Sequence, residues 1–246
     1  MVGSVLKGAL ISFQPAAGLG LPSLPNVIIF QINPEAITHA WTEAAAPQPP
    51  SDPKVNYSPL AVTGVPGESF SFTLMLDSDE QIADGSTNPI GAQSATISGA
   101  YTRLAAIELL QYPLNPPSAG LVGQVSAATS AAGLGTSAAA SQATSVPESQ
   151  VPVVLFVWGA FRIVPVRVTA LSVAEKLYDS LLNPTHVEAQ ITLTVLTPDE
   201  LAAVQGPMAG IAQAAYSYTQ GVRQTQALAN LGESAASILG MLPTAL

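Results

Sequence analysis

The sequence has no cysteine and few charged residues, and both shortages exclude classes of function. Without cysteine the chain can form no disulfide, no thiolate metal site and no cysteine nucleophile, although this is neutral about the cellular compartment. Charged residues make up 9 % of the 246 residues, with 7 Lys and Arg against 16 Asp and Glu. The basic residues are scattered, whereas nucleic acids and anionic membranes are bound by clustered Lys and Arg. We therefore expect no nucleic-acid partner.

The sequence also lacks long apolar runs. No stretch approaches the roughly twenty strongly apolar residues of a membrane span, so no direct membrane insertion is expected. The apolar run after Lys7 ends at Gln14 and is too short for a secretory signal. Hydrophobic residues nevertheless make up 48 % of the chain, which is enough for one sizeable core. With so few charges to keep copies apart, we expect other subunits to cover much of the surface.

Motifs for catalysis or cofactor binding are missing as well. The sequence contains neither the Gly-x-Ser-x-Gly elbow of hydrolases nor a glycine-rich nucleotide-binding loop. His39 and His186 are the two histidines, and a surface histidine after a turn is the simpler interpretation of His186. The acidic run from Asp77 fails the calcium-loop pattern, because Gln81 and Ile82 stand where a ligand and a glycine are required. We therefore predict no catalytic residue, no metal and no cofactor, in a protein that is not an enzyme.

The second half of the chain carries the clearest strand signals. In residues 187–195 apolar and polar side chains alternate, which predicts a strand with one buried face. Val153–Trp158 is apolar on both faces, as is typical of a central strand, and Gly159 marks the turn into a strand at Phe161–Val173. A sharp turn is predicted at Asn183-Pro184. We therefore expect an antiparallel sheet.

Three more strands are predicted in the first half, at Val5–Phe13, Asn26–Asn33 and Glu68–Asp77. The last of these alternates Phe and Leu with Ser and Thr, so its buried face is unambiguous. Glu35–Trp41 has apolar residues at helical spacing but is too short for a helix that stands alone. Pro47–Pro59 contains five prolines and is predicted to be an extended surface loop.

One helix is predicted between the strands. Asp77–Gly91 is polar and rich in turn residues. Ala100–Tyr112 then has a helical stripe that ends before Pro113, and we expect this helix to start between Ser94 and Ser98. The stripe consists of Leu104, Ile107, Leu110 and Gln111.

Residues 115–150 are dominated by Ala, Ser, Gly and Thr. Such a composition buries too little apolar surface to offset the cost of ordering it, so we expect a long mobile insertion. Because Ala is a strong helix former, a helical alternative stays open.

The end of the chain is predicted to be helical. Thr197 is a good N-cap, and it is followed by Pro198 at the first helical position and by two carboxylates. Gly206-Pro207 should interrupt the helix. Glu233–Leu242 is amphipathic and is expected to need a groove on this protein or on another.

Together these segments predict an α+β fold that is mainly antiparallel β. The expected domains are a β domain at residues 1–197, with a flexible insertion at 115–150, and a helical C-terminal extension at 198–246.

Three motifs in a fixed order resemble a known family. They are FQINPE within Phe30–Ile37, LFVWG within Val153–Gly159 and NPTHVEA within Leu182–Val195. With ELLQYP at Glu108–Pro113 between the first and second, the succession resembles the tube-like baseplate proteins of contractile injection systems, which are relatives of phage tail tube and tube-initiator proteins. The resemblance covers Val5–Thr197. Its motif residues are Phe30, Asn33, Pro34, Glu35, Phe156, Trp158, Gly159, Asn183 and Pro184.

The resemblance implies a phage tail-tube-like β-barrel or sandwich with one packed helix and a C-terminal helical tail. It also implies a structural baseplate subunit, present in about six copies in a ring, that joins the spike and hub to the inner tube or to the baseplate wedges. The expected partners are therefore further copies of the chain, the inner tube protein, the spike or hub protein and the wedge proteins. The expected location is the bacterial cytoplasm, in a phage-tail-like particle that lysis can release.

The C-terminal part departs from the family. Adaptor members of the family often carry a C-terminal LysM domain of β-α-α-β pattern, whereas residues 198–246 are predicted to be helical. This departure argues against peptidoglycan binding or wedge clamping by this chain. Phage-type relatives also lack the insertion at 115–150.

Two other functions are compatible with the sequence. A β-sandwich could bind a small ligand or a glycan, without catalysis, through the loops at Pro47–Pro59 and Asn115–Gln150. A hydrolase would need His39 or His186 as a catalytic group, so single substitutions there would abolish its activity.

Overall fold

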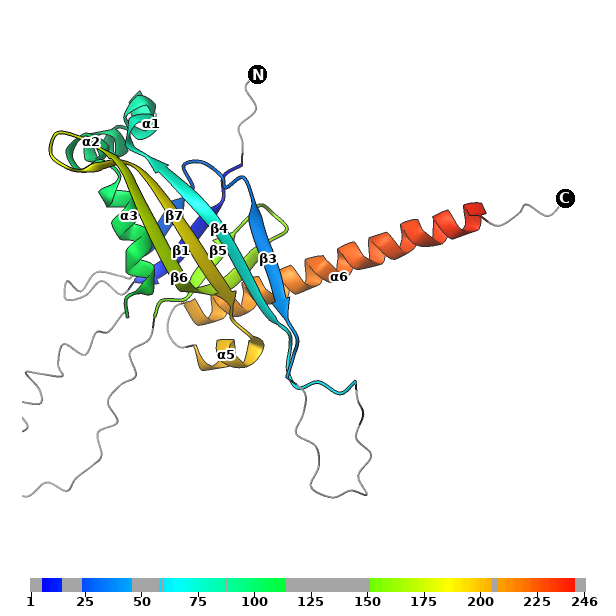
Figure 1. The fold of residues 1–246 in the computed structure, drawn as a ribbon. Coiled ribbons are helices and arrows are strands. Elements are labelled where there is room, and N and C mark those ends of the chain that lie inside the picture. Colours follow the sequence, from blue (N-terminus) through cyan, green and yellow to red (C-terminus); the bar gives the residue numbers. More distant parts are fainter. Residues whose placement is uncertain are drawn as a thin grey trace, which may run out of the picture.

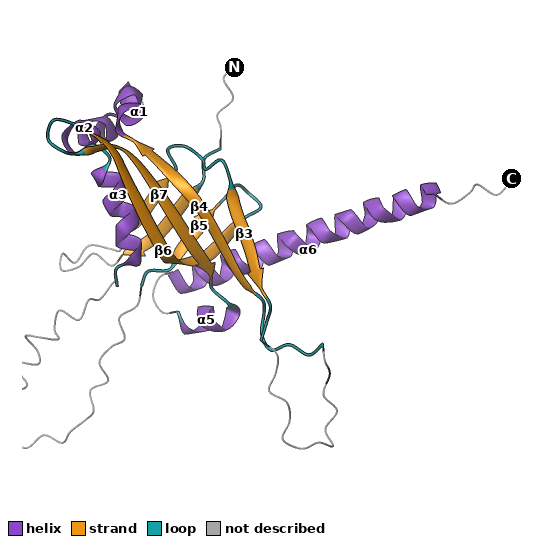
Figure 2. Ribbon diagram, in the orientation of Figure 1, coloured by secondary structure: helices purple, strands orange, loops and turns teal. Residues whose placement is uncertain are grey.

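The computed structural model describes residues 6–14, 24–45, 58, 60–86, 88–113, 151–204 and 208–241. Within them the chain forms a seven-stranded antiparallel sheet with helices packed around it (Figures 1 and 2). The α+β class predicted from the sequence is therefore confirmed. The strands are β1 (Ala9–Gln14), β2 (Leu24–Ile29), β3 (Ile37–Thr42), β4 (Gly67–Asp77), β5 (Val154–Val157), β6 (Ile163–Tyr178) and β7 (Pro184–Val195).

The strands follow the order β2-β1-β5-β6-β7-β4-β3 across the sheet. The long strand β6 connects two halves, because residues 163–166 pair with β5 and residues 166–178 pair with β7. Its register shifts between Val168 and Ala170, and such a bulge bends a strand. The two edges of the sheet are β2 and β3, although these strands follow one another in the sequence.

The core lies against one face of the sheet. The alternation predicted for the strands now named β4 and β7 is confirmed, since their Phe, Leu, Val and Ile side chains are buried on this face. The strand now named β5 is central, as predicted, and Phe156 within it is fully buried. Helix α3 (Tyr101–Glu108) covers the core with Leu104 and Ile107, and Leu110 follows just after it.

Aromatic contacts show that the sheet curls around this core. The ring centroid of Phe30, which directly follows β2, lies 5.6 Å from that of Phe72 in β4 and 6.5 Å from that of Phe156 in β5. Residues 30–36 join β2 to β3, so one short connection links the opposite edges. Over the described residues the sheet is not closed, and the phage tail-tube-like barrel therefore stays an expectation.

The helices lie at the ends of the sheet and across one face. At one end of the long strands, α1, α2 and α3 lie together (Figure 1). Near the other end α5 begins at the N-cap predicted at Thr197, whose side chain accepts a hydrogen bond from the Glu200 backbone N–H within a capping box. Their bounds are α1 (Ser78–Ala83), η1 (Asp84–Ser86), α2 (Pro89–Ser98), α3, η2 (Leu109–Gln111), α5 (Pro198–Ala203) and α6 (Met208–Met241).

Helix α6 has two unlike halves. Its first half is packed against the sheet, with Met208, Ala212 and Ala215 buried beside apolar side chains of β5 and of the segment after β7. In residues 224–234 every side chain is exposed. Figure 1 shows this second half running out beyond the sheet.

The helical spacing of Glu35–Trp41 is not realised, because residues 37–42 form the edge strand β3. Each of these six residues has a partner in β4, and pairing with an existing strand stabilises an extended segment that is too short to be helical alone. Ile37 and His39 then point to the core side at strand spacing.

The turn-rich interpretation of Asp77–Gly91 is also corrected. The segment contains α1, and α2 already begins at Pro89, before the predicted start. The predicted single helix is broken at Gly99, which has φ +57°. Of the predicted stripe, Leu104, Ile107 and Leu110 are buried, whereas Gln111 is exposed.

Other predictions shift or fall outside the described residues. Strand β6 continues to Tyr178, five residues beyond its predicted end, because β7 pairs with it along most of its length. The turn predicted at Asn183-Pro184 occupies residues 179–183, and Pro184 already begins β7. The insertion at 115–150, the break at Gly206-Pro207 and all of the Pro47–Pro59 loop except Ser58 lie outside the described residues.

Candidate interaction surfaces and polar clusters

The outer face of β3, β4 and β7 is polar but uncharged over much of its length. The register places Thr38, Ser71 and Thr192 side by side across the three strands, on the face opposite the core. Short side chains of this kind leave a flat surface with hydrogen-bonding groups and no fixed charge. The nine residues of this surface, called here the Ser/Thr face, are Thr38, Ala40, Thr42, Ser69, Ser71, Thr73, Gln190, Thr192 and Thr194.

A shallow pocket of about 440 Å³ opens beside this face. Its floor is formed by β4 and β7, and its wall by the connection that carries Asn33, Pro34 and Glu35. The ionisable groups that line it are Glu35 and Glu188. A pair of carboxylates also occurs in glycoside hydrolases, so these two lining groups by themselves assign no activity to the pocket.

The edges of the sheet form a second candidate surface. Strands β2 and β3 each pair on one side alone in the described structure, so the backbone groups on the other side are open to another strand. Val27 and Ile29 of β2 are 48 % and 55 % exposed, and Trp41 of β3 is 59 % exposed. Exposed apolar side chains on open edge strands are typical of sites that pair with another chain.

A buried carboxylate joins β3, β4 and α6. Glu68 of β4 is 7 % exposed, and Arg223 of α6 binds both of its oxygens, with 2.8 Å between Nη1 and Oε2. His39 Nε2 lies 2.7 Å from Glu68 Oε1, and its ring stacks on Phe70. The Arg162 guanidinium lies over the Phe70 ring, 5.2 Å from the ring centroid. The cluster therefore ties the long helix to the edge of the sheet.

The electrostatics of this cluster favour a fixed ion pair. Burial by itself raises the pKa of Glu68, but the hydrogen bonds and charges of Arg223 and His39 outweigh it and hold that pKa below its ordinary value. Burial lowers the pKa of His39, with Arg162 and Arg223 acting in the same direction, so the imidazole is favoured in its neutral form. A carboxylate that is already paired with an arginine is poorly suited to act as a general base.

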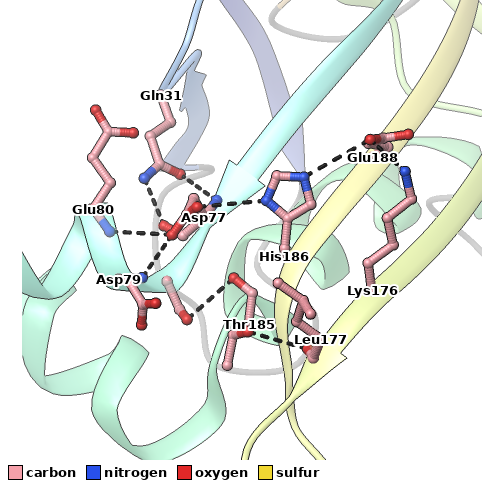
Figure 3. Close-up of polar contacts among 10 residues, drawn as sticks. Gln31, Asp77, Asp79, Glu80, Lys176, Leu177, Thr185, His186 and Glu188 are labelled. Atoms are coloured by element: carbon pink, nitrogen blue, oxygen red, sulfur yellow. Dashed lines mark hydrogen bonds and ion pairs between the residues drawn. The ribbon is translucent and has the colours of Figure 1, made fainter.

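A second polar cluster lies at the far end of β4, β6 and β7 (Figure 3). Asp77 Oδ1 accepts hydrogen bonds from the Asp79 and Glu80 backbone N–H groups, at 2.8 and 3.2 Å, so it caps the start of α1. The Gln31 side chain donates to the Asp77 carbonyl oxygen and accepts from its N–H. The acidic run that resembled a calcium loop in composition is thus a helix start.

His186 and Glu188 complete this second cluster. His186 Nδ1 lies 3.4 Å from Asp77 Oδ2, and Lys176 Nζ lies 2.5 Å from Glu188 Oε1. The hydrogen bond from Lys176 lowers the pKa of Glu188. Figure 3 shows these side chains in a row along neighbouring strands, which is the arrangement of cross-strand ion pairs.

The motif residues of the first segment fix the chain around β1 and β2. Phe30 is buried, and its N–H donates to the Gly8 carbonyl at 2.8 Å. Asn33 accepts from the Gly8 N–H and donates to the Leu6 carbonyl, both at 2.9 Å. A Cβ at Gly8 would lie 2.7 Å from the Phe30 and Trp158 rings, so this close approach requires glycine.

The remaining motif residues lie in two other places. Phe156 is fully buried, Trp158 is half-buried beside Phe30, and Gly159 has φ +73° in the turn to β6. Asn183 closes the β6–β7 turn on Asp179, and its hydrogen bonds hold the Asp179 pKa below its ordinary value. The Pro184 carbonyl accepts from the Ala100 N–H and so attaches α3 to the sheet.

The structure therefore does not bring the nine motif residues into one site. Phe30, Phe156 and Trp158 meet in the core, Asn33, Pro34 and Glu35 line the shallow pocket, and the others shape turns and connections. Sequence reasoning missed Glu68, although its signal was present. Glu68 stands two positions before Phe70 in a strand of period two, which places its carboxylate on the buried face.

Comparison of the sequence with profiles of known protein families and with curated proteins gave no significant match. Among the described residues, no three His, Cys, Asp or Glu side chains are arranged to hold a metal ion. Over the same residues, no helix combines the length and the apolar character that a membrane crossing requires.

Proposed function

We propose that this chain is a structural subunit of the baseplate of a contractile injection system. In this proposal about six copies form a ring that joins the spike and hub to the inner tube or to the wedges, within a phage-tail-like particle assembled in the bacterial cytoplasm. The observation that carries the proposal is the open antiparallel sheet, whose two unpaired edges lie in one chain.

The open edges support a head-to-tail ring. A contact between β2 of one copy and β3 of the next uses two different surfaces, so it repeats from copy to copy and closes if the rotation allows. Added strands satisfy the backbone groups of both edges. A continuous sheet of this kind needs no catalytic residue.

The Ser/Thr face supports the same assignment. None of its nine residues is charged, so neighbouring copies and rings can lie close to it without a desolvated charge. The charged groups of these strands are gathered at the two ends instead, in the Glu68 cluster and in the Asp77 cluster. Both clusters have structural partners, which leaves them without a free acid–base pair.

The absence of cysteine makes a direct test of the edge contact possible. Val27→Cys on β2 is combined in turn with Thr38→Cys, Ala40→Cys or Thr42→Cys on β3, and each double variant is oxidised under native conditions. Because β-carbons must approach to about 4 Å for a disulfide to form, one register should cross-link far better than the other two. Non-reducing gels should show a ladder that ends at a closed ring.

The controls are the cysteine-free parent and each single-cysteine variant. A single cysteine cannot give a ladder, and the parent gives no cross-link at all. Negative-stain images of the parent should show rings, and purification from the native host should recover spike, tube or wedge proteins with it. A chain that stays monomeric, gives no ladder in any register and binds none of these proteins would overturn the proposal.

A further inference from the structure

An apolar strip on the outer face of β2 has no cover in the described structure. Val27 and Ile29 are both about half exposed, and Val27 lies beside Ile11 of β1, which lies beside Leu155 of β5. Helix α6 covers this face at Leu155 and packs against Ile11, but it stops short of β2. We call Val27, Ile29 and Ile11 the β2 strip.

The second half of α6 is a matching unpartnered surface. Leu228 and Leu231 are 68 % and 64 % exposed, where the helix has left the sheet (Figure 1). The two leucines stand three positions apart in α6 and therefore lie on the same side of the helix. Such spacing gives a helix one apolar stripe.

In the described structure the two surfaces do not cover each other, since Val27 and Ile29 are exposed and so are Leu228 and Leu231. Helix α6 leaves the sheet at Arg223, where the ion pair with Glu68 and the contact from His39 place it next to the β3 edge. The β2 strip belongs to the opposite edge of the sheet. The helix continues beyond Arg223 to Met241, and this part runs out beyond the sheet (Figure 1).

We infer that the second half of α6 docks on the β2 strip of the next copy in the ring. This inference rests on the proposed ring, in which β3 of one copy meets β2 of the next. Helix α6 leaves its own sheet at the β3 edge. In the ring, the β2 edge of the next copy, which carries the β2 strip, lies against that β3 edge. The first half of α6 covers the outer face of its own sheet at β5. The docked second half covers the same face of the neighbour's sheet at β2.

The charges favour this occupant over a coiled coil of α6 helices. Coiled coils in water carry charged residues beside their apolar stripe, which set pairing and orientation. Here Glu233 is the single charged residue in 224–246, and Gly232 and Ser234 stand on either side of it. The segment 24–32, which contains β2, has no charge either. Two uncharged apolar surfaces bury each other without a desolvation cost for ions.

The test uses two variants of the full chain and their mixture. The pair Leu228→Asp with Leu231→Asp places charges on the apolar surface of the helix. The pair Val27→Lys with Ile29→Lys places charges on the β2 strip. Ile90 and Ile97 are exposed on α2, so Ile90→Asp with Ile97→Asp and Ile90→Lys with Ile97→Lys are the charge-matched controls. Sedimentation velocity over a range of concentrations measures association, and circular dichroism checks the fold.

We expect each docking variant to associate at least about tenfold more weakly than the parent, with an unchanged spectrum. The controls should associate as the parent does. An equimolar mixture of the two variants should regain association as far as the heterodimer, because the intact helix of the strip variant can dock on the intact strip of the helix variant, whereas the reverse contact carries both changes. Recovery in the mixture shows that the helix of one copy contacts the strip of another, since an interface that pairs helix with helix or strip with strip keeps a damaged side in every mixed pair.

Two results would overturn the inference. If the strip variant associates like the parent while the helix variant does not, the helices pair with one another. If both variants associate like the parent, neither surface is used. Either result leaves the cysteine ladder between β2 and β3 intact when the ring exists, so failure of this contact is distinct from failure of the ring.

Discussion

Glu68 is a buried carboxylate at a position where the rest of the inner face of β4 carries Phe and Leu. Removing a carboxylate from water is unfavourable, and the cost is offset here by a two-oxygen contact with Arg223 and a hydrogen bond with His39. Three elements that are far apart in the sequence therefore meet at one side chain. The position of α6 depends on it.

Glu68→Gln should lower the free energy of unfolding by about 2 kcal/mol, because the arginine keeps a neutral acceptor but loses its ionic partner. The matched control is Lys176→Gln, which breaks the half-exposed pair with Glu188 and should change stability by less than about 1 kcal/mol. Urea unfolding of the two variants and the parent measures both values. Equal effects would contradict a special role for the buried pair.

The helices and strands differ in how far the sequence predicts them. Strands β4 and β7 alternate without interruption, so period two identifies their buried face. The six residues of β3 carry two competing spacings, and the choice depends on β4, which follows β3 only after a long connection. Helix α1 has few apolar residues to mark it, and its start depends on the Asp77 cap.

Two glycines should respond oppositely to alanine. Gly99 lies between α2 and α3 with φ +57°, and a Cβ there would lie 2.5 Å from the Pro184 carbonyl oxygen. Gly99→Ala should therefore destabilise the protein by about 2 kcal/mol or more. Gly221 lies inside α6 with open space around it, so Gly221→Ala should stabilise by up to about 1 kcal/mol. Thermal unfolding distinguishes the two, and a loss at both positions would show that Gly221 is also constrained.

The whole molecule combines predictable pieces in an arrangement that the sequence does not show. The antiparallel sheet, its central strand and the helical extension follow from periodicity and capping. The strand order does not, because β1 pairs with β5 across most of the chain and no local pattern records such a partner. The period of β4 is enough to predict that Glu68 is buried. Its partner Arg223 could not be predicted, because the composition of α6 does not reveal how this helix packs.

Truncations should separate the two halves of α6. Of the side chains that the structure describes in residues 225–246, all are exposed, so removal of these residues should leave the free energy of unfolding within about 0.5 kcal/mol of the parent, while association weakens. Removal of residues 198–246 also uncovers Leu155 and Leu196 and takes Arg223 from Glu68, so it should cost roughly 5 kcal/mol. Urea unfolding checks both. Equal stability of the two truncated chains would mean that the first half of α6 adds nothing to the fold.

The strand order also sets a sequence of events during synthesis. The β1–β2 and β3–β4 hairpins leave the ribosome early, yet in the finished sheet they flank β5, β6 and β7, which are the last of the strands to be translated. Until β5, β6 and β7 have been synthesised, each hairpin therefore has one unpaired inner strand edge and one uncovered apolar face. Non-local pairing of this kind folds slowly and exposes nascent chains to aggregation. The β6–β7 hairpin has a tight turn and a long ladder, which favour fast formation. Once formed, it can connect the β1–β2 hairpin, through β5, to the β3–β4 hairpin.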